Sequence, residues 1–280
     1  MTDTIGVIGA GLMGREIALV FAMAGHPVIL TDRSDDALAA ALTRQGEIVT
    51  RGIARGLFPE TARAALPRIT TATDPAALAP CAFVTEAVFE DVEVKAAVLA
   101  AADAVLAPAA ILATNTSTIP ISVIAAHLPE ARRPRFIGTH YFSPVTRMPL
   151  VEVIPGLATA PETLAATTAR MQAIGKTPVT IKDVPGFAVN RLLHVMLIEA
   201  VRLIEEGVAT PADIDTAARL GLGHPMGPFE LMDATTSSLC LTAQEIMFDA
   251  YGERFRPRPL LKTRVRAGLT GGRGRPGWRT

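Results

Sequence analysis

The sequence predicts an α/β fold, in which a doubly wound parallel sheet is followed by a smaller all-α domain. Short apolar runs typical of buried strands alternate with longer runs of helical spacing between residues 5 and 182. A glycine-rich turn joins the first of these strands to the first helix. Beyond Pro185, apolar residues recur only at helical spacing. We therefore expect a sheet domain over residues 1–184 and a helical domain over residues 185–280.

The composition is that of a globular protein with a large core. The chain has 280 residues, of which 49% are hydrophobic and only 5% aromatic, so the core consists mainly of Ala, Val, Leu and Ile. Lysine plus arginine and aspartate plus glutamate both number 27. This neutral balance gives no electrostatic case for binding nucleic acid or an anionic membrane surface.

Neither a targeting segment nor a membrane span is predicted. The N-terminal residues lack a charged region ahead of an apolar run, and the longest apolar stretch, residues 96–113, is interrupted by Asp103 and Pro108. Cys81 and Cys240 lie far apart and fit no metal or redox spacing. We expect both to be buried thiols of a cytoplasmic protein without a metal site.

The first strand and the first helix frame a glycine motif. Ile5–Ile8 has the character of a buried strand, and residues 15–25 continue with helical spacing. Between them lies G-x-G-x-x-G, formed by Gly9, Gly11 and Gly14 with Leu12 and Met13 inside it. These glycines allow a tight turn, a close approach of the backbone to a pyrophosphate, and close packing of helix on strand. Because a helix N-terminus stabilises a pyrophosphate, the motif predicts a Rossmann-type dinucleotide site.

An acidic residue follows the second strand. Residues 27–31 form an apolar run that ends at Asp32, where such folds place the acid that binds the adenosine ribose hydroxyls. A carboxylate there repels a 2′-phosphate, so NAD is favoured over NADP. The adjacent Arg33 leaves the alternative open, since a guanidinium can accept a phosphate.

The remaining elements of the sheet domain alternate in the same way. Residues 34–55 are polar, alanine-rich and helical in character, which indicates a helical arm over the cofactor domain. A turn at residues 56–59 and a short helix at 60–66 follow. Further strands are expected at 82–86, 111–115, 136–140, 150–154 and 178–182, and a helix at 161–174. This alternation predicts a parallel sheet with helices on both faces.

A strand, a loop and a strand between residues 136 and 154 carry the strongest candidate for catalysis. His140 closes the first strand, and Glu152 lies in the second. Histidine is the side chain best suited to moving a proton near neutral pH, and a carboxylate on a neighbouring strand can hold its ring and stabilise its charged form. An isolated pair of this kind would be a buried structural histidine and a surface glutamate. The dinucleotide motif favours the catalytic interpretation.

The helical domain is marked by one amphipathic helix and one capping box. The apolar positions Leu192, Leu193, Met196, Leu197, Ala200 and Ile204 predict one face of a helix. Residues 210–213 form a capping box with proline at the first helical position, and Gly221–Gly223 ends that helix. The glycine- and arginine-rich residues 271–280 are expected to be poorly ordered.

Taken together, these segments resemble the L-3-hydroxyacyl-CoA dehydrogenase family in its short form, without a fused hydratase. The resemblance runs from about Ile5 to Leu269. The matching motifs are Gly9–Gly14, Glu86–Lys95, Asn115–Ser117, Gly138–Pro144, Leu150–Glu152, Pro185–Arg191 and Gly221–Pro228. The resemblance implies a Rossmann-type domain, a smaller helical domain that dimerises, and a role in fatty acid metabolism.

The resemblance also assigns catalytic roles. His140 would be the general base toward the 3-hydroxyl of the substrate, and Glu152 would orient its imidazole. Ser117 and Asn190 would form hydrogen bonds with the substrate oxygen or the histidine region, with Asn190 coming from the second domain. Ser117 can instead cap a following helix, and Asn190 can be an ordinary polar residue on a helix.

The binding residues come from the same resemblance. Glu90 and Lys95 would contact the ribose and nicotinamide end of NAD, although both also fit a solvated helix face. Ser143 stands where many members have asparagine near the nicotinamide, and Ser117 is likewise expected to contact the cofactor. Arg55 occupies the place of a lysine that faces the CoA phosphates, but it also suits an exposed arm.

Two segments depart from the family pattern. Asp233–Ser238 replaces a more hydrophobic, glycine-containing segment, and the tail has only Trp278 where the family has an aromatic cluster. The first departure bears on the local helix packing and on the expected dimer contact.

The sequence therefore predicts an NAD-dependent dehydrogenase of (3S)-3-hydroxyacyl-CoA thioesters that acts as a homodimer. One alternative is a dehydrogenase of the same superfamily that acts on a small hydroxy acid without CoA, of the gulonate or carnitine type. Another is a non-catalytic dinucleotide-binding protein. The intact residues His140, Glu152, Ser117 and Asn190 speak against the latter.

Overall fold

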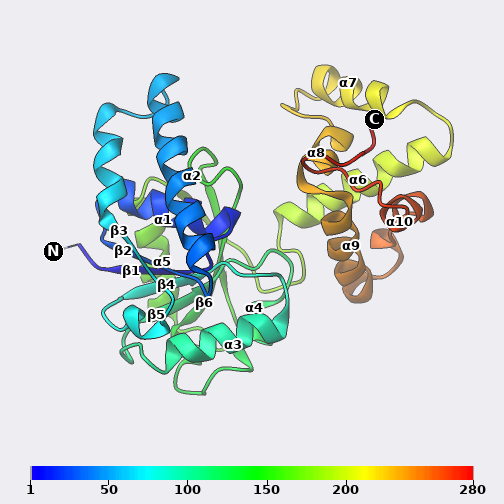
Figure 1. Ribbon diagram of the computed structural model, residues 1–280. Coiled ribbons are helices and arrows are strands. Elements are labelled where there is room, and N and C mark those ends of the chain that lie inside the picture. Colours follow the sequence, from blue (N-terminus) through cyan, green and yellow to red (C-terminus); the bar gives the residue numbers. More distant parts are fainter. Residues whose placement is uncertain (1, 280) are drawn as a thin grey trace. The chain divides into compact units, whose positions relative to one another are not determined.

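The computed structural model describes residues 2–279 as two compact units. Unit 1 spans Met1–Val184 and unit 2 spans Pro185–Thr280. Each unit has its own core, and each is described by itself (Figure 1). Within the described residues, no helix is long and apolar enough to cross a lipid bilayer.

Unit 1 is built on a single sheet of eight strands in the order β3-β2-β1-β4-β5-β6-β7-β8. The strands are β1 (Ile5–Ile8), β2 (Val28–Thr31), β3 (Ile69–Ala72), β4 (Phe83–Glu86), β5 (Ile111–Thr114), β6 (Phe136–Tyr141), β7 (Leu150–Pro155) and β8 (Thr177–Thr180). All neighbouring pairs are parallel except β6 and β7, which are antiparallel. The strands that the sequence predicted are confirmed, and the parallel arrangement is corrected at this one pair, because a loop of eight residues is too short for a parallel crossover.

Helices connect the strands of unit 1. They are α1 (Leu12–Met23), α2 (Asp35–Ala54), α3 (Val92–Asp103), α4 (Ile121–Ala125) and α5 (Pro161–Ala173), with 3₁₀ segments η1 (Glu60–Arg68), η2 (Pro75–Leu78) and η3 (Arg133–Arg135). Ser34 caps α2 by accepting a hydrogen bond from Ala37 N, and Asp91 caps α3 through Val94 N. As predicted, α2 is a long helix; it packs against η1, and both extend beyond the sheet (Figure 1).

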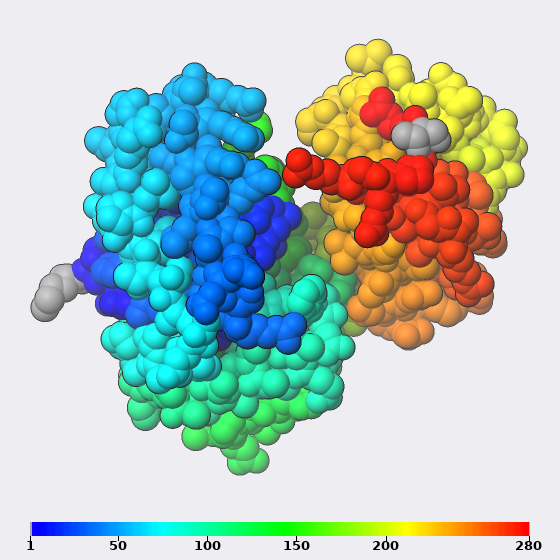
Figure 2. Space-filling model, viewed as in Figure 1, coloured from blue at the N-terminus to red at the C-terminus, as the bar shows by residue number. Residues whose placement is uncertain are grey.

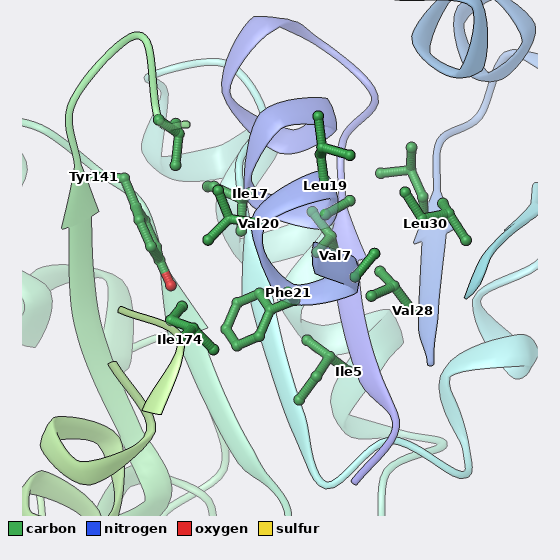
Figure 3. Close-up of a cluster of buried hydrophobic side chains, with 14 of the residues drawn as sticks. Ile5, Val7, Ile17, Leu19, Val20, Phe21, Val28, Leu30, Tyr141 and Ile174 are labelled. Carbon is green, nitrogen blue, oxygen red and sulfur yellow. The ribbon is translucent and has the colours of Figure 1, made fainter. Parts of the chain in front are cut away.

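The core of unit 1 lies between α1 and the sheet. Figure 3 shows Val7 of β1 and Leu30 of β2 beside Ile17 and Phe21 of α1, and all four side chains are completely buried. Burying one such side chain stabilises the folded state by about 1.5–3 kcal/mol. This packing fixes α1, and therefore its N-terminus, against the middle of the sheet.

Strand β3 was not predicted from the sequence. Its sequence is Ile-Thr-Thr-Ala, and only Ile69 is buried. An edge strand packs on one side only, so its apolar signal is weak. The edge position of β3, next to β2, explains why no apolar run marks it.

Unit 2 is helical, as predicted. Its elements are α6 (Val189–Glu205), α7 (Pro211–Gly221), α8 (Pro228–Thr235), α9 (Ser237–Tyr251), η4 (Glu253–Phe255) and α10 (Pro259–Arg266). The side chain of Thr210 caps α7 through Asp213 N, and Pro211 is the first residue of that helix, which confirms the capping prediction. Leu197 and Val201 of α6 pack with Phe229, Met232 and other residues of the core. Leu192 does not contribute to this core, because it is 77% exposed.

The expectation of a poorly ordered tail is wrong for residues 271–279, which pack against α8 and α9. The Asp233 carboxylate accepts hydrogen bonds from Trp278 N at 2.9 Å and from Arg279 N at 3.3 Å. Trp278 Nε1 donates to Ser237 Oγ at 2.9 Å, and its ring lies 4.9 Å from that of Phe229. Figure 2 shows the tail, in red, lying on the surface of the same unit. Thr280 lies outside the described residues.

The two departures from the family pattern therefore meet in the structure. Asp233 and Ser237 belong to the divergent segment, and they hold the divergent tail. A Cβ on Gly277 would lie 2.1 Å from Asp233 Oδ1, so only glycine fits beside this carboxylate. The polar segment replaces apolar packing with hydrogen bonds to the tail.

We predict that Asp233→Ala lowers the free energy of unfolding of unit 2 by about 2 kcal/mol, because two backbone N–H groups lose a charged acceptor. Trp278 is the single tryptophan of the chain, so its fluorescence during urea unfolding reports directly on this unit. Asp249→Ala, at an exposed position of α9, is the matched control and should leave the midpoint unchanged. Equal midpoints for the two variants would show that the hydrogen bonds from the tail to Asp233 contribute nothing to the stability of unit 2.

Candidate active site

The carboxyl ends of four neighbouring strands form one edge of the sheet. In the register of the sheet, Ile8 of β1 pairs with Glu86 of β4, and Glu86 pairs with Thr114 of β5. Thr114 pairs in turn with Gly138 of β6, two residues before His140. The segments that follow these strands therefore lie side by side, where open α/β sheets bind their ligands.

The glycine motif forms the turn between β1 and α1. Gly9 has a φ of +101°, and a Cβ there would lie 2.7 Å from the carbonyl oxygen of Ala87. A Cβ on Gly14 would lie 1.8 Å from Gly9 O. Only glycine at position 14 therefore lets the start of the helix pack this closely against the turn. Gly11 has open space around its missing side chain, and no side chain caps α1 there. The backbone can thus approach a pyrophosphate, and the first N–H groups of α1 can bind it.

Asp32 follows β2 and is tied to the same turn. Its Oδ2 accepts a hydrogen bond from Ala10 N at 2.8 Å, and its Oδ1 accepts one from Ser34 N at 3.1 Å. The carboxylate is therefore fixed beside the glycine turn, with lone pairs remaining for ribose hydroxyls. The residues present fit a dinucleotide without a 2′-phosphate.

His140 and Glu152 form a hydrogen-bonded pair across β6 and β7. The two residues lie directly opposite each other in the antiparallel register, and Nδ1 of His140 is 2.7 Å from Oε2 of Glu152. Their exposed fractions are 6% and 1%. An ionised carboxylate can only accept, so this contact favours the tautomer with the proton on Nδ1. The ring of Phe142 lies 4.4 Å from the imidazole and limits its rotation.

The segment after β5 is anchored to both neighbouring strands. Asn115 Oδ1 accepts a hydrogen bond from Tyr141 N at 2.9 Å, directly after His140. On the other side, Glu90 Oε1 accepts from Ser117 N at 2.8 Å and from Thr118 N at 3.0 Å. Helix α4 begins only at Ile121, so Ser117 lies in a turn and does not cap that helix.

The carboxylate of Glu90 accepts several hydrogen bonds from this turn. Its Oε1 also accepts from the hydroxyls of Thr116 at 2.7 Å and of Ser117 and Thr118 at 3.2 Å. Burial works to raise the pKa of Glu90, but the charge of Lys95 and the hydrogen bonds from the turn outweigh it and hold that pKa below its usual value. Glu90 is therefore an anion at neutral pH.

Lys95 is buried between two carboxylates. Its exposed fraction is 1%, and its Nζ lies 2.9 Å from Glu86 Oε1 and 3.3 Å from Glu90 Oε2. Glu86 is completely buried and also accepts hydrogen bonds from Thr114 Oγ1 and Val88 N, both at 2.6 Å. Sequence reasoning missed Glu86; an acidic residue that ends a fully buried strand was the signal that could have revealed it.

The other predicted residues come from different segments of the chain. Ser143 is exposed in the loop after β6, where it precedes a cis proline. Arg55 is exposed at the C-terminal end of α2. Asn190 is the second residue of α6 in unit 2, so its contribution to a site in unit 1 stays a prediction. Among the described residues, no group of three His, Cys, Asp or Glu side chains could hold a metal ion.

Both units match models of one family. The NAD binding domain model of 3-hydroxyacyl-CoA dehydrogenase matches residues 4–184, and the C-terminal domain model of 3-hydroxyacyl-CoA dehydrogenase matches residues 186–280. The chain belongs to the 3-hydroxyacyl-CoA dehydrogenase family. Unit 1, with its glycine turn and Asp32, is thus the NAD-binding domain of that family.

Relatives of known name agree with this family over nearly the whole chain. A probable 3-hydroxybutyryl-CoA dehydrogenase of Deinococcus radiodurans is 38% identical over 271 residues, which cover 95% of each chain. The mitochondrial hydroxyacyl-coenzyme A dehydrogenase of Sus scrofa is 41% identical over 92% of this chain and 85% of its own. The crystal structure of (S)-3-hydroxybutyryl-CoA dehydrogenase from Ralstonia eutropha superimposes with a TM-score of 0.92 at 36% identity, covering 99% of this chain and 98% of the other.

We predict that His140→Gln keeps NADH binding and lowers turnover by about 10²- to 10⁴-fold, the usual contribution of general acid–base catalysis. Glu152→Gln should also lower turnover, because an amide cannot stabilise the imidazolium as a carboxylate does. Since the two side chains act as one unit, the double variant should be little worse than His140→Gln alone.

The measurement is a double-mutant cycle on kcat, with NADH affinity determined separately by fluorescence. His127→Gln, at an exposed position after α4, is the control for a histidine substitution and should behave as the parent. A double variant that showed the full product of the two single losses would mean that the residues work independently.

Proposed function

We propose that the protein oxidises a (3S)-3-hydroxyacyl-CoA to the 3-oxoacyl-CoA with NAD, and catalyses the reverse reaction. The observation that carries this proposal is the buried pair His140–Glu152 at the sheet edge that also carries the dinucleotide turn. Such a pair can transfer a proton beside the turn that would hold the dinucleotide. Membership of the 3-hydroxyacyl-CoA dehydrogenase family supports the substrate class.

The proton is handled by His140 and Glu152. In the oxidation, Nε2 of the neutral imidazole takes the proton of the 3-hydroxyl while C3 gives up a hydride. Bound NAD supplies the acceptor for that hydride, which carries the two electrons that leave the alcohol. Glu152 stabilises the imidazolium that results, and in the reduction the imidazolium returns the proton. Ser117 and Asn190 form hydrogen bonds with the substrate oxygen and restrict its position.

The cofactor is held by the turn and by the sheet edge. Backbone groups of Gly9, Gly11, Leu12, Met13 and Gly14 bind the pyrophosphate, and Asp32 binds the adenosine ribose. Glu90, Ser117 and Ser143 border the nicotinamide end. The pyrophosphate and ribose assignments rest on the open space at Gly11, the uncapped start of α1 and the fixed Asp32 carboxylate, and the nicotinamide assignments rest on the family pattern.

Arg55 is proposed to meet the CoA phosphates. It lies exposed at the end of α2, and Arg51 lies one turn before it on the same helix. A guanidinium pairs well with a phosphate and keeps its charge at any physiological pH.

Both cysteines are unpaired and buried, which supports a reducing compartment such as the cytoplasm.

The test is an NADH-oxidation assay across a panel of 3-oxoacyl-CoA thioesters, with the free 3-oxo acids in parallel. We expect turnover of the thioesters, much poorer turnover of the acids, and a preference for NADH over NADPH by kcat/KM. Arg55→Glu should raise KM for the thioester more than it lowers kcat, because this contact is remote from the reaction.

Three outcomes of this assay would redirect the assignment. Better turnover of free acids would favour a dehydrogenase of small hydroxy acids. Retained NADH binding without any turnover would favour a non-catalytic dinucleotide-binding protein. An unchanged KM in Arg55→Glu would remove Arg55 from the site and leave the proposed reaction intact.

We also propose that unit 2 pairs with a second copy of the chain. An apolar groove of about 620 Å³ lies between α6 and α7 and is lined by Leu192, Val195, Met196 and Leu222, among others. The exposed fractions of Leu192 and Leu222 are 77% and 69%. Exposed apolar patches of this kind mark association surfaces, and a two-fold axis buries the same patch on both copies.

Sedimentation velocity tests this proposal. The parent protein should sediment as a dimer, and Leu222→Glu should sediment as a monomer at the same concentration, because a buried charge opposes association. Leu157→Glu is the matched control, since Leu157 is 93% exposed on unit 1. A parent protein that sediments as a monomer would contradict the proposal.

A further inference from the structure

We propose that Lys176 is a positioning residue for the reaction, because it holds the loop that joins the strands of His140 and Glu152. The proposal rests on the proposed function. Lys176 lies in unit 1, in the turn between α5 and β8, and its exposed fraction is 9%. Burial disfavours the charged form of a lysine, so a buried lysine has a specific structural or functional role.

The backbone of Lys176 is fixed by the end of α5. Gly175 has a φ of +78°, which suits glycine and turns the chain out of the helix. Lys176 N donates to Met171 O at 2.9 Å, and Thr177 N donates to Pro149 O at 2.8 Å at the start of β8. Since β8 pairs in parallel with β7, this turn lies beside the residues that precede β7.

The side chain of Lys176 binds the loop of residues 142–149, which connects β6 to β7. Its Nζ donates to Met148 O at 2.8 Å and also donates to Val145 O. One amino group therefore holds two carbonyl oxygens that lie three residues apart in the loop. Of residues 143–149, only Val145 is buried, so apolar packing gives the loop little support.

The same loop lies between the two residues of the proton-transfer pair. It follows β6, which carries His140, and leads into β7, which carries Glu152. The ring of Phe142, the first residue of the loop, lies 4.4 Å from the imidazole of His140, and Ser143 comes next. A shift of the loop would therefore change the packing of the imidazole, and a displacement of about 1 Å can slow a reaction about 100-fold.

Glu16 of α1 carries the opposite charge. Its exposed fraction is 5%, and within the part of the chain that the structure describes its Oε2 has no hydrogen-bond partner. Burial lowers the pKa of Lys176 below its usual value, and the charge of Glu16 opposes that effect. Lys176 thus interacts with the helix that follows the dinucleotide turn as well as with the loop after His140.

A purely structural role would require only this charge compensation. In that case, Lys176 would be present because Glu16 is buried, and the loop would keep its position without it. Neutralising Glu16 removes the need for a counter-charge, but it does not replace the donor for Val145 O and Met148 O. A double variant without either charge therefore separates the two roles.

The experiment compares Lys176→Met, the double variant Lys176→Met/Glu16→Gln, and Arg132→Met with the parent protein. Arg132 is the matched control, because it is a buried cation, 6% exposed, that pairs with Asp103 and donates to Ala110 O at the amino end of β5. The readouts are kcat and KM with a 3-oxoacyl-CoA thioester, NADH Kd by fluorescence, and Tm.

For Lys176→Met we expect kcat to fall about 10- to 100-fold, because the loop loses its donor. Its Tm should fall as well, because the buried carboxylate of Glu16 loses its counter-charge. The double variant should regain most of the Tm while its kcat stays at least about tenfold below that of the parent. NADH Kd should change by no more than about fivefold in both variants, because the glycine turn and Asp32 are unaltered. Arg132→Met should lower Tm and leave kcat unchanged.

Two results would overturn the proposal. Recovery of kcat together with Tm in the double variant would mean that Lys176 only compensates Glu16. An unchanged kcat in Lys176→Met would mean that the loop keeps its position without the lysine.

The double variant also decides if Lys176→Met does not fold. A lowered kcat with retained NADH binding then supports the proposal, and a parent-like kcat or a lost NADH affinity contradicts it. Absent turnover by the parent protein contradicts the proposed function itself. Turnover by the parent with a parent-like kcat in the Lys176 variants contradicts only the role of Lys176.

Discussion

The hydrogen bond between His140 and Glu152 is the interaction around which unit 1 is arranged. The antiparallel register of β6 and β7 sets the two side chains directly opposite each other on one face. The carboxylate is buried, so its charge acts on the imidazole with little screening. The parallel strands on the other side of β6 then bring the glycine turn and the Ser117 turn to the same edge. A proton acceptor and a dinucleotide site thus share one edge of one sheet.

The polar groups at this edge are organised as buried networks. Glu86, Lys95 and Glu90 alternate in charge, and the hydroxyls of Thr116, Ser117 and Thr118 donate hydrogen bonds to the carboxylate of Glu90. Such a network adds little net stability over apolar packing, but each missing member leaves a buried group unsatisfied. The network therefore specifies one position for the turn. That specificity suits a site in which Ser117 must meet a substrate oxygen.

Much of the fold and part of the site followed from sequence because the signals were local. The glycine turn, the strand that ends at Asp32 and the helix capped by Thr210 are short patterns with their own physical cause. His140 and Glu152 were predictable as neighbours, since two strands joined by a short loop must pair. Strand β3 was missed because an edge strand with two exposed threonines lacks an apolar run.

The remaining errors concern residues whose state depends on distant partners. The tail looks disordered by composition, yet Asp233 and Ser237 order it through hydrogen bonds that no local pattern reveals. From the sequence alone, Lys95 resembles a solvated residue on a helix. In the structure it is buried, because Glu86, nine positions earlier, is its buried counter-ion. Asn190, Ser143 and Arg55 stay predictions, because their roles depend on ligands and on the placement of unit 2.

The tautomer of His140 tests the central claim most directly. Nitrogen-15 NMR of protein labelled at histidine, recorded with NAD bound at a pH where the ring is neutral, distinguishes a protonated ring nitrogen from one with a lone pair. Assignment follows from the signal lost in His140→Gln. The account predicts a proton on Nδ1, held by Glu152, and a lone pair on Nε2. A proton on Nε2 in the neutral ring would contradict it, because that nitrogen could not then accept the proton of the substrate.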